Sequence, residues 1–250
     1  MPLEEALAAY AADGYVRLGR VLSDEGLARL RERADALMLG QRRYPGLFFQ
    51  HDTETGRYED LEYGKGWQGP SLSYRKLEKL ELDDRFRALI ENALFARIAR
   101  AVVGDAVAIY RAVLMNKPAA GGTVLPFHQD AGRFWGLDRD PHLQIWTALD
   151  DAGLEGGCLE VVPGTHRAGL ATPLGGLIPE AVVAASENEA RTIALPARAG
   201  EAILIHNYVW HRSGRSQSGQ PRRAFSVCYI DAATRCLRTR RAPRQFVRVF

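Results

Sequence analysis

The sequence predicts a mainly β fold with flanking α-helices, because two hydrophobic patterns occupy different parts of the chain. Before residue 104, apolar residues recur every three or four positions, as they do on one face of a helix. From Val107 onward, short runs rich in Val, Ile, Leu and aromatic residues are separated by turn residues, with no long helix between them. Helices followed by seven or eight strands favour a β-sandwich or barrel over an alternating sheet of strands and helices.

Three helices are expected in the N-terminal region, residues 1–103. A short alanine-rich helix precedes the segment GYVRL, residues 14–18. Ser23 is placed to cap a second helix, whose apolar residues recur at i, i+3 and i+4 spacing: Leu27, Leu30, Ala34, Leu37 and Met38. The third helix is expected over about residues 83–103, with Gly104 marking its end.

Residues 41–74 lose the helical periodicity and are rich in Gly, Pro and aromatic residues. A long irregular stretch of this kind is typical of a binding loop or lid, so it is a candidate cover for a substrate. The β core is expected over about residues 107–232, with strands at VAIYRAVLMN, VLPFHQD, LQIWTALDD, CLEVVP, RTIALPA, EAILIH and AFSVCYID. Residues 233–250 form an Arg-rich segment that we interpret as a solvated terminal strand or a subunit contact.

Length and charge limit the classes of partner. A chain of 250 residues, 46% of them hydrophobic, is long enough to bury a full core and predicts one domain over residues 1–250. Its 33 basic and 30 acidic residues nearly balance, so we expect a small-molecule partner and neither nucleic acid nor a membrane. The absence of a recognisable leader or membrane span, and three cysteines without a C-x-x-C pair, predict a cytoplasmic protein, as a monomer or a homodimer.

The segment PFHQDAGRFW, residues 126–135, suggests a metal site because His128 and Asp130 are two positions apart. On a strand these side chains point to the same face, and that of Gln129 points to the other. Two histidines and one carboxylate on one face of Fe(II), with the remaining positions open, are the ligand pattern of non-haem iron oxygenases. Alone, His-x-Asp is a weak signal, and an incidental polar pair on a strand is the alternative.

A third ligand is available in the segment GEAILIHNYVWHRSGRSQSGQPRRAFSVCYI, which contains His206 and His211. We expect His206 to be a core or strand-end histidine whose hydrogen bonds are satisfied. His211 is followed by a polar loop and then by Arg222. A metal-bound dicarboxylate needs a cation at its far end, and Arg222 can supply it if the loop returns as an antiparallel neighbour.

Several segments in order resemble one family: MNKPA, FHQD, IWTALDD, GGCLEVVPGTH and HRSG, followed by PRRAFSVCYI. Together they look like the phytanoyl-CoA dioxygenase family of Fe(II)- and 2-oxoglutarate-dependent oxygenases, and they extend over most of the chain. The resemblance implies a double-stranded β-helix, also called a jelly roll or cupin-like fold. It also implies that His128, Asp130 and His211 hold Fe(II), with 2-oxoglutarate and O2 as co-substrates.

The same resemblance assigns contacts with the co-substrate. Arg222 would bind the distal carboxylate of 2-oxoglutarate, and Ser213 would assist it. Further positions that resemble co-substrate contacts are Trp146, Met115 and Lys76, with Lys79 as an alternative to Lys76 in register.

Asp130 narrows the expected chemistry. Related halogenases have a small residue where hydroxylases have this carboxylate, so Asp130 favours oxygen insertion over halogen transfer. The implied activity is hydroxylation of an unactivated C–H bond of a small organic substrate, with release of succinate and CO2. The alternatives are desaturation or epoxidation at the same iron, a catalytically silent jelly-roll binding protein, and a zinc hydrolase with the same ligands.

Substrate contacts are expected close to the candidate ligands in sequence. The candidates are Gln129, Arg133, Phe134, Trp135 and Trp210, although aromatic residues in such places are also typical of the core or the rim. His166 lies in a turn, where it can contact a substrate or be a hydrogen-bonded loop residue. His51 and His142 are expected in exposed polar segments.

Overall fold

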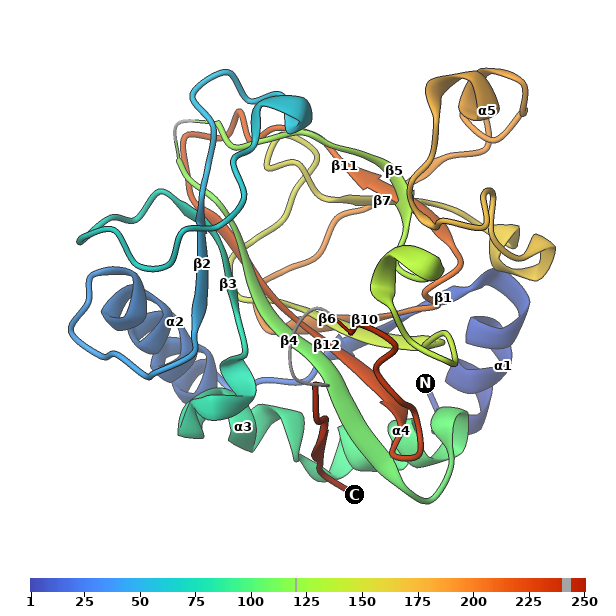
Figure 1. Cartoon of the computed structure of the whole chain (residues 1–250), viewed down its shortest axis with the longest axis horizontal. Helices are drawn as coiled ribbons and strands as arrows, with labels where there is room; N and C mark the ends of the chain where they lie inside the picture. The colour runs from blue at the N-terminus through green and yellow to red at the C-terminus, as the bar shows by residue number, and fades with distance from the viewer. Residues whose placement is uncertain (120, 240–243) are drawn as a thin grey trace.

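The computed structural model describes residues 1–119, 121–239 and 244–250, and it contains two antiparallel β-sheets that face each other (Figure 1). The larger sheet contains, in spatial order, β1 (Tyr15–Arg20), β10 (Glu201–Ile205), β6 (Leu143–Ala148), β12 (Arg222–Asp231), β4 (Val107–Lys117), β3 (Tyr74–Glu78) and β2 (Phe48–His51), and β13 (Val247–Arg248) pairs with β4. The smaller sheet contains β8 (Gly176–Leu177), β5 (Leu125–Gln129), β11 (Trp210–Ser213), β7 (Leu159–Val162) and β9 (Ile193–Leu195). This arrangement confirms the mainly β jelly roll that the sequence predicts.

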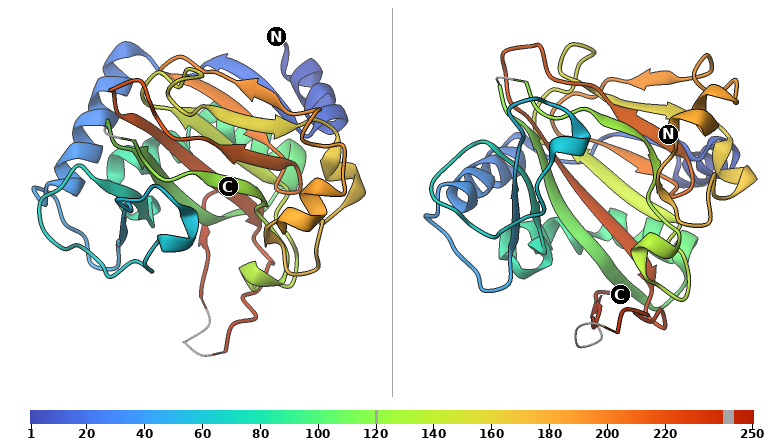
Figure 2. Two further views of the ribbon diagram at one scale, coloured as in Figure 1. Left: turned by 90° about the horizontal axis from the view of Figure 1, so that it is seen from above. Right: turned by 45° about the horizontal axis from the view of Figure 1, so that its top comes forward.

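The helices gather at the outer face of the larger sheet, on the side away from the smaller sheet (Figures 1 and 2). They are α1 (Leu3–Asp13), α2 (Asp24–Met38), α3 (Asp84–Ile90) and α4 (Ala93–Val103), while α5 (Glu180–Ala184) follows β8. Short 3-10 turns are η1 (Tyr58–Asp60), η2 (Leu80–Leu82), η3 (Arg133–Trp135) and η4 (Thr165–Ala168). Within the described parts of the chain, no helix has both the length and the apolarity to cross a bilayer.

Side-chain caps set the helix boundaries. The Ser23 hydroxyl accepts a hydrogen bond from the backbone N–H of Gly26 at 3.1 Å and starts α2, as expected. The single helix expected over residues 83–103 is wrong, because α3 and α4 are separate. Asn92 interrupts them: its side-chain oxygen accepts from the backbone N–H of Phe95 at 2.9 Å and caps α4, which ends before Gly104.

The larger sheet separates two apolar layers. On its outer face, Phe86 of α3 packs against Phe225 of β12 with ring centroids 5.0 Å apart, and both side chains are fully buried. On its inner face, Trp146 and Ala224 pack with residues of the smaller sheet such as Val161. Because successive side chains on a strand alternate between faces, the outward burial of Phe225 directs its neighbours toward the space between the sheets.

Two terminal or irregular segments add strands to the larger sheet. Residues 41–74 were expected to be irregular, but they include β2, in which Phe48 is paired with Glu78 of β3. The Arg-rich C-terminal segment ends in β13, where Val247 is paired with Ile109 of β4, in agreement with the terminal-strand interpretation. Residues 240–243 of that segment lie outside the described residues.

The packing of Phe86 on Phe225 predicts a large loss of stability on truncation. Phe86→Ala should lower the free energy of unfolding by about 3–5 kcal/mol, because it leaves a cavity between α3 and the sheet. Leu154, which is 70% exposed, provides the control. Leu154→Ala should change the free energy of unfolding by less than about 0.5 kcal/mol. Urea unfolding followed by circular dichroism measures both values, and equal effects of the two substitutions would contradict this packing.

Candidate metal centre

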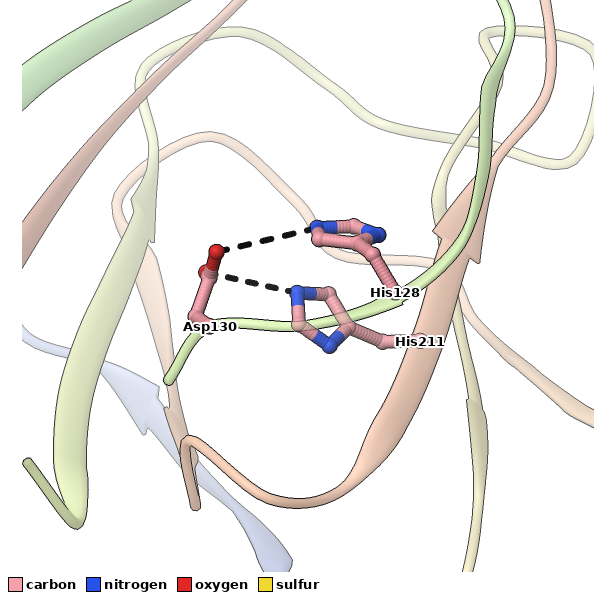
Figure 3. Close-up of side chains that lie close together, drawn as sticks. All are labelled: His128, Asp130 and His211. Carbon is pink, nitrogen blue, oxygen red and sulfur yellow. Dashed lines mark ion pairs between the residues drawn. The ribbon is translucent and has the colours of Figure 1, made fainter. Parts of the chain in front are cut away.

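His128 and His211 meet because they are directly opposite each other on neighbouring strands. In the antiparallel pairing of β5 with β11, the Cα of His211 is the partner of the Cα of His128. Side chains at such paired positions share a face of the sheet, and the two imidazole centroids are 3.9 Å apart. Asp130 follows the end of β5 and turns its carboxylate toward both rings (Figure 3).

The three side chains are close enough to bind one ion. Nε2 of His128 lies 4.0 Å from Oδ1 of Asp130, and Nε2 of His211 lies 3.5 Å from Oδ2. One potential ligand atom from each residue lies within 4.8 Å of the others, and in the described ranges this is the one group of three or more such residues with that property. Two imidazole nitrogens and one carboxylate match the donor set of a non-haem ferrous centre, so these residues fit Fe(II).

Backbone carbonyls fix the tautomer of both rings. Nδ1 of His128 lies 2.9 Å from the carbonyl oxygen of Pro126, and Nδ1 of His211 lies 3.0 Å from that of Val209. A carbonyl oxygen can only accept, so each Nδ1 carries the proton and donates. The lone pair of each Nε2 is therefore free and is directed toward Asp130, as metal coordination requires.

The protonation states also suit a cation. Burial, and then the nearby His211, lower the pKa of His128 to about 3, so this imidazole is neutral at neutral pH. Burial alone would raise the pKa of Asp130, but its surroundings, among them the guanidinium of Arg111, hold it well below its usual range. Neutral imidazoles and an ionised carboxylate are the forms that bind a metal ion.

Residues that the sequence did not single out orient Asp130. Nε2 of Gln144 on β6 donates to Oδ2 of Asp130 at 2.6 Å, and Ser226 of β12 donates to the Gln144 oxygen at 3.3 Å. Asn207 bonds the backbone of Asp130 in both directions, at 2.8 and 2.9 Å. Such hydrogen bonds around a ligand fix its orientation. The one sequence signal for Gln144 is its place two residues before Trp146, on the same face of the strand.

Arg222 is a buried cation on the inner face of the larger sheet. It is 4% exposed, its Nη2 donates to the carbonyl oxygen of Gly157 at 2.7 Å, and its Nε has no hydrogen-bond partner among the described residues. The described carboxylates include none within 4.0 Å of it, and burial lowers its pKa to about 10. A buried guanidinium without a counter-ion is costly, so this position suits the carboxylate of a bound molecule.

The other residues predicted to contact the co-substrate differ in how close they lie to Arg222. The Arg222 guanidinium carbon lies 5.8 Å from the ring centroid of Trp146. Ser213 is buried two residues after His211, and Lys76 of β3 is the Cα partner of Met115 of β4. Nζ of Lys76 forms an ion pair with Glu78 at 2.7 Å, directed away from Arg222 along the strand. Lys79 follows the end of β3 and is exposed.

Lys117, which the sequence-based assignment omitted, is the Cα partner of Arg222. It is 6% exposed, and its Nζ donates to the carbonyl oxygen of Thr123 at 2.7 Å. Burial, followed by the charge of Arg222, lowers the pKa of this amine to about 6. The pairing of Arg222 with Lys117 therefore places two buried basic groups side by side at one end of the inner face.

Two of the substrate candidates, Gln129 and Trp210, lie on the outer face of the smaller sheet. Gln129 is fully buried and bonds the backbone of Gly169, Ala171 and Tyr208 on the face opposite to His128. Trp210 packs with Phe127 on that same outer side. The structure therefore does not bring Gln129 or Trp210 to the candidate ligands, because each of them precedes or follows His128 or His211 on its strand and points to the other face.

The three residues of η3 differ in exposure. Arg133 and Phe134 are exposed, and Trp135 is buried and stacks on Tyr110 with centroids 4.6 Å apart.

Three of the remaining histidines, His142, His166 and His206, lie close together. His206 lies 4.9 Å from His166 and 5.0 Å from His142 between ring centroids, and its Nδ1 accepts a hydrogen bond from the backbone N–H of Tyr208 at 3.0 Å. His142 is exposed, and His51 is partly exposed and packs on Tyr74.

Comparison with known proteins agrees with this geometry. The family model described as "Phytanoyl-CoA dioxygenase (PhyH)" matches residues 10–224. Phytanoyl-CoA dioxygenase domain-containing protein 1 of Bos taurus is 31% identical over 161 residues, which cover 61% of this chain and 55% of that protein. The chain thus spans about half the length of that relative.

Two further proteins match over nearly the whole chain. L-proline trans-4-hydroxylase of Streptomyces griseoviridis is 25% identical over 252 residues, which cover 91% of this chain and 86% of that protein. The crystal structure of EctD from S. alaskensis with 2-oxoglutarate and 5-hydroxyectoine superposes with a TM-score of 0.73 at 22% identity, covering 94% of this chain and 78% of EctD. With the family model matched over most of its length, the chain belongs to the phytanoyl-CoA dioxygenase (PhyH) family.

Proposed function

We propose that this protein is an Fe(II)- and 2-oxoglutarate-dependent oxygenase that hydroxylates an unactivated C–H bond of a small organic substrate, with release of succinate and CO2. One observation supports it above all: His128, Asp130 and His211 converge at the inner space that also contains the buried Arg222, which has no carboxylate partner among the described residues. We further propose a single-domain cytoplasmic enzyme, a monomer or a homodimer, with no nucleic-acid or membrane partner.

Each residue has a distinct task in this proposal. His128, Asp130 and His211 hold Fe(II), which when bound supplies the activation of O2 that the oxidation of a C–H bond requires. Gln144 keeps the Asp130 carboxylate oriented through its 2.6 Å hydrogen bond. Arg222 binds the distal carboxylate of 2-oxoglutarate with help from Ser213, and Trp146 packs against the guanidinium.

The chain's residues also control charge and water around the reaction. The carboxylate of the co-substrate acts as the counter-ion of the buried Arg222. Binding therefore pairs a charge that is costly to leave unpaired in the interior. Trp146, Met115 and Ala224 line the same face with apolar groups, which limits the water that can reach the co-substrate.

The alternatives leave parts of this arrangement unexplained. A silent binding protein would not need the complete ligand set together with its carbonyl-fixed tautomers. A zinc hydrolase would not need a buried cation for a dicarboxylate. The hydroxylase named among the relatives favours hydroxylation over desaturation or epoxidation.

Removal of one ligand should abolish metal binding and turnover together. His211→Ala should lose stoichiometric Fe(II) binding in anaerobic equilibrium dialysis, and it should release no succinate from 2-oxoglutarate in the presence of O2. His142→Ala changes an exposed histidine outside the ligand set and is the matched control, expected to behave as the wild type. Succinate release by His211→Ala at the wild-type rate would refute the iron assignment.

Removal of the Arg222 side chain should weaken the binding of 2-oxoglutarate and leave the binding of the metal unchanged. Arg222→Ala should raise the 2-oxoglutarate concentration for half-maximal succinate release by about 30-fold or more, because truncating a buried charge pair costs about 2–5 kcal/mol. Its Fe(II) affinity should stay within about twofold of the wild type.

Arg212→Ala is the control for this substitution. Arg212 is the neighbour of His211 but forms ion pairs with Glu160 and Glu189, both at 2.8 Å. An equal loss of Fe(II) and 2-oxoglutarate affinity in Arg222→Ala would show that Arg222 is not the co-substrate anchor.

A further inference from the structure

The inner face of the larger sheet contains a second charged cluster, made by Arg111, Glu78 and Lys76. Nη2 of Arg111 donates to Oε1 of Glu78 at 3.1 Å, and Nζ of Lys76 lies 2.7 Å from the same oxygen. The side chains of these residues are about one fifth to one quarter exposed, so the cluster is interior but accessible. Apart from the co-substrate contact expected of Lys76 and the effect of the Arg111 charge on Asp130, the proposed function gives this cluster no task.

Strand register places this cluster next to the metal centre. Arg111 of β4 is the Cα partner of Cys228 of β12, and Cys228 is the Cα partner of Gln144 of β6. Paired residues share a face, so this row runs from Arg111 to the glutamine that bonds Asp130. Adjacent strands are about 4.8 Å apart, so the backbones of Arg111 and Gln144 are separated by about 10 Å, the length of a small molecule.

The cluster carries more positive than negative charge. Arg75, the residue before Lys76, bonds the Gln50 side chain at 3.0 Å and has no carboxylate within 4.0 Å among the described residues. Burial lowers the pKa of Arg75, and the nearby charge of Arg111 lowers it further. Two cations share one oxygen of Glu78, and the third, Arg75, has no carboxylate partner among the described residues, so Glu78 orients the cluster without neutralising it.

Arg111 is held in a fixed orientation with donors to spare. A guanidinium has five N–H donors, and within the described chain Arg111 uses one, to Glu78. Its guanidinium carbon lies 5.3 Å from the ring centroid of the buried Trp135, which supports one side of the group. Burial opposes the charge, but Glu78 and Asp130 raise the pKa of Arg111 above its usual range, so it stays cationic.

We infer that Arg111, positioned by Glu78 and assisted by Lys76, binds an oxyanion on the primary substrate, either a carboxylate or a phosphate monoester. This inference rests on the proposed function, because it takes the C–H bond to be oxidised as lying between this anchor and the iron. A substrate held by its anionic end at Arg111 reaches toward Asp130 along the row through Cys228 and Gln144. Lys76 then contacts the substrate. This contact adds to, or replaces, the contact with the co-substrate that the family resemblance implies for Lys76.

The test uses small probes with one chain length and different end groups: hexanoate, hexyl phosphate and hexanamide. Each is added to the full-length protein with Mn(II), a redox-silent substitute for Fe(II), and saturating 2-oxoglutarate. The measurement is the paramagnetic enhancement of probe proton relaxation in NMR, corrected with a Zn(II) sample. It reports binding close to the metal and requires no turnover.

At least one of the two oxyanion probes should show an enhancement at least fivefold above that of hexanamide. Arg111→Gln should remove this difference, and Arg111→Lys should keep part of it. Arg87→Gln is the control, because Arg87 lies on α3 and is paired with Glu91 at 2.7 Å. Equal enhancement of all three probes, no enhancement of any, or an undiminished preference in Arg111→Gln would overturn the inference.

Two further titrations on the same samples distinguish a failure of the substrate anchor from a failure of the proposed function. Mn(II) binding is followed by electron paramagnetic resonance, and 2-oxoglutarate binding by calorimetry. Normal binding of both without probe discrimination overturns the substrate anchor alone. Loss of Mn(II) or 2-oxoglutarate binding in the wild type contradicts the proposed function and the anchor together. Thermal unfolding of Arg111→Gln verifies that the variant is folded, and Arg111→Lys provides a second folded variant if it is not.

Discussion

The candidate site depends on one strand pairing, in which His211 of β11 is directly opposite His128 of β5. A shift of this register by one residue would turn every side chain of β11 to the other face and separate the two imidazoles. The pairing is held on the other side of β11 as well, where four consecutive residues of β7 are in register with it. The irregularity between His211 and Ser213 relative to β5 then lets the chain leave toward the loop that returns at Arg222.

Interior charges that lack a full set of partners are the second feature that links structure to function. Several charged residues outside the candidate site form ion pairs: the buried Asp83 accepts from Arg33 at 2.7 Å, and Arg223 is bound by Asp150. The interior charges of the site differ, since Arg222 lacks a carboxylate among the described residues and Arg111 has unused donors. A folded protein retains such costly groups where a ligand completes them. In our proposal, Arg222 marks the end of the inner face that binds the co-substrate, and Arg111 marks the end that binds the substrate.

The candidate ligands and Arg222 could be proposed from sequence because strand alternation and the order of family motifs point to them. Alternation predicts that His128 and Asp130 share a face, although β5 ends at Gln129 and Asp130 lies just beyond it, and the resemblance to the phytanoyl-CoA dioxygenase family supplies His211 and Arg222. The same alternation explains why Gln129 and Trp210, chosen for their nearness in sequence, lie on the opposite face. Gln144 and Arg111 escaped notice because their relation to Asp130 depends on the register of β4, β12 and β6, which are far apart in the chain. The break at Asn92 was missed because the apolar periodicity continues across it, whereas the capping hydrogen bond decides the boundary.

The central claim is that one Fe(II) and one 2-oxoglutarate bind together in the space bounded by His128, Asp130, His211 and Arg222. Chelation of Fe(II) by 2-oxoglutarate through its keto and carboxylate oxygens produces a visible charge-transfer absorption band. Anaerobic absorption spectroscopy of the purified protein therefore tests the claim most directly. We expect the band to form only when both components are present, with one Fe(II) and one 2-oxoglutarate per chain. Absence of the band at saturating concentrations of both, or a band of unchanged intensity in Asp130→Ala, would contradict the account.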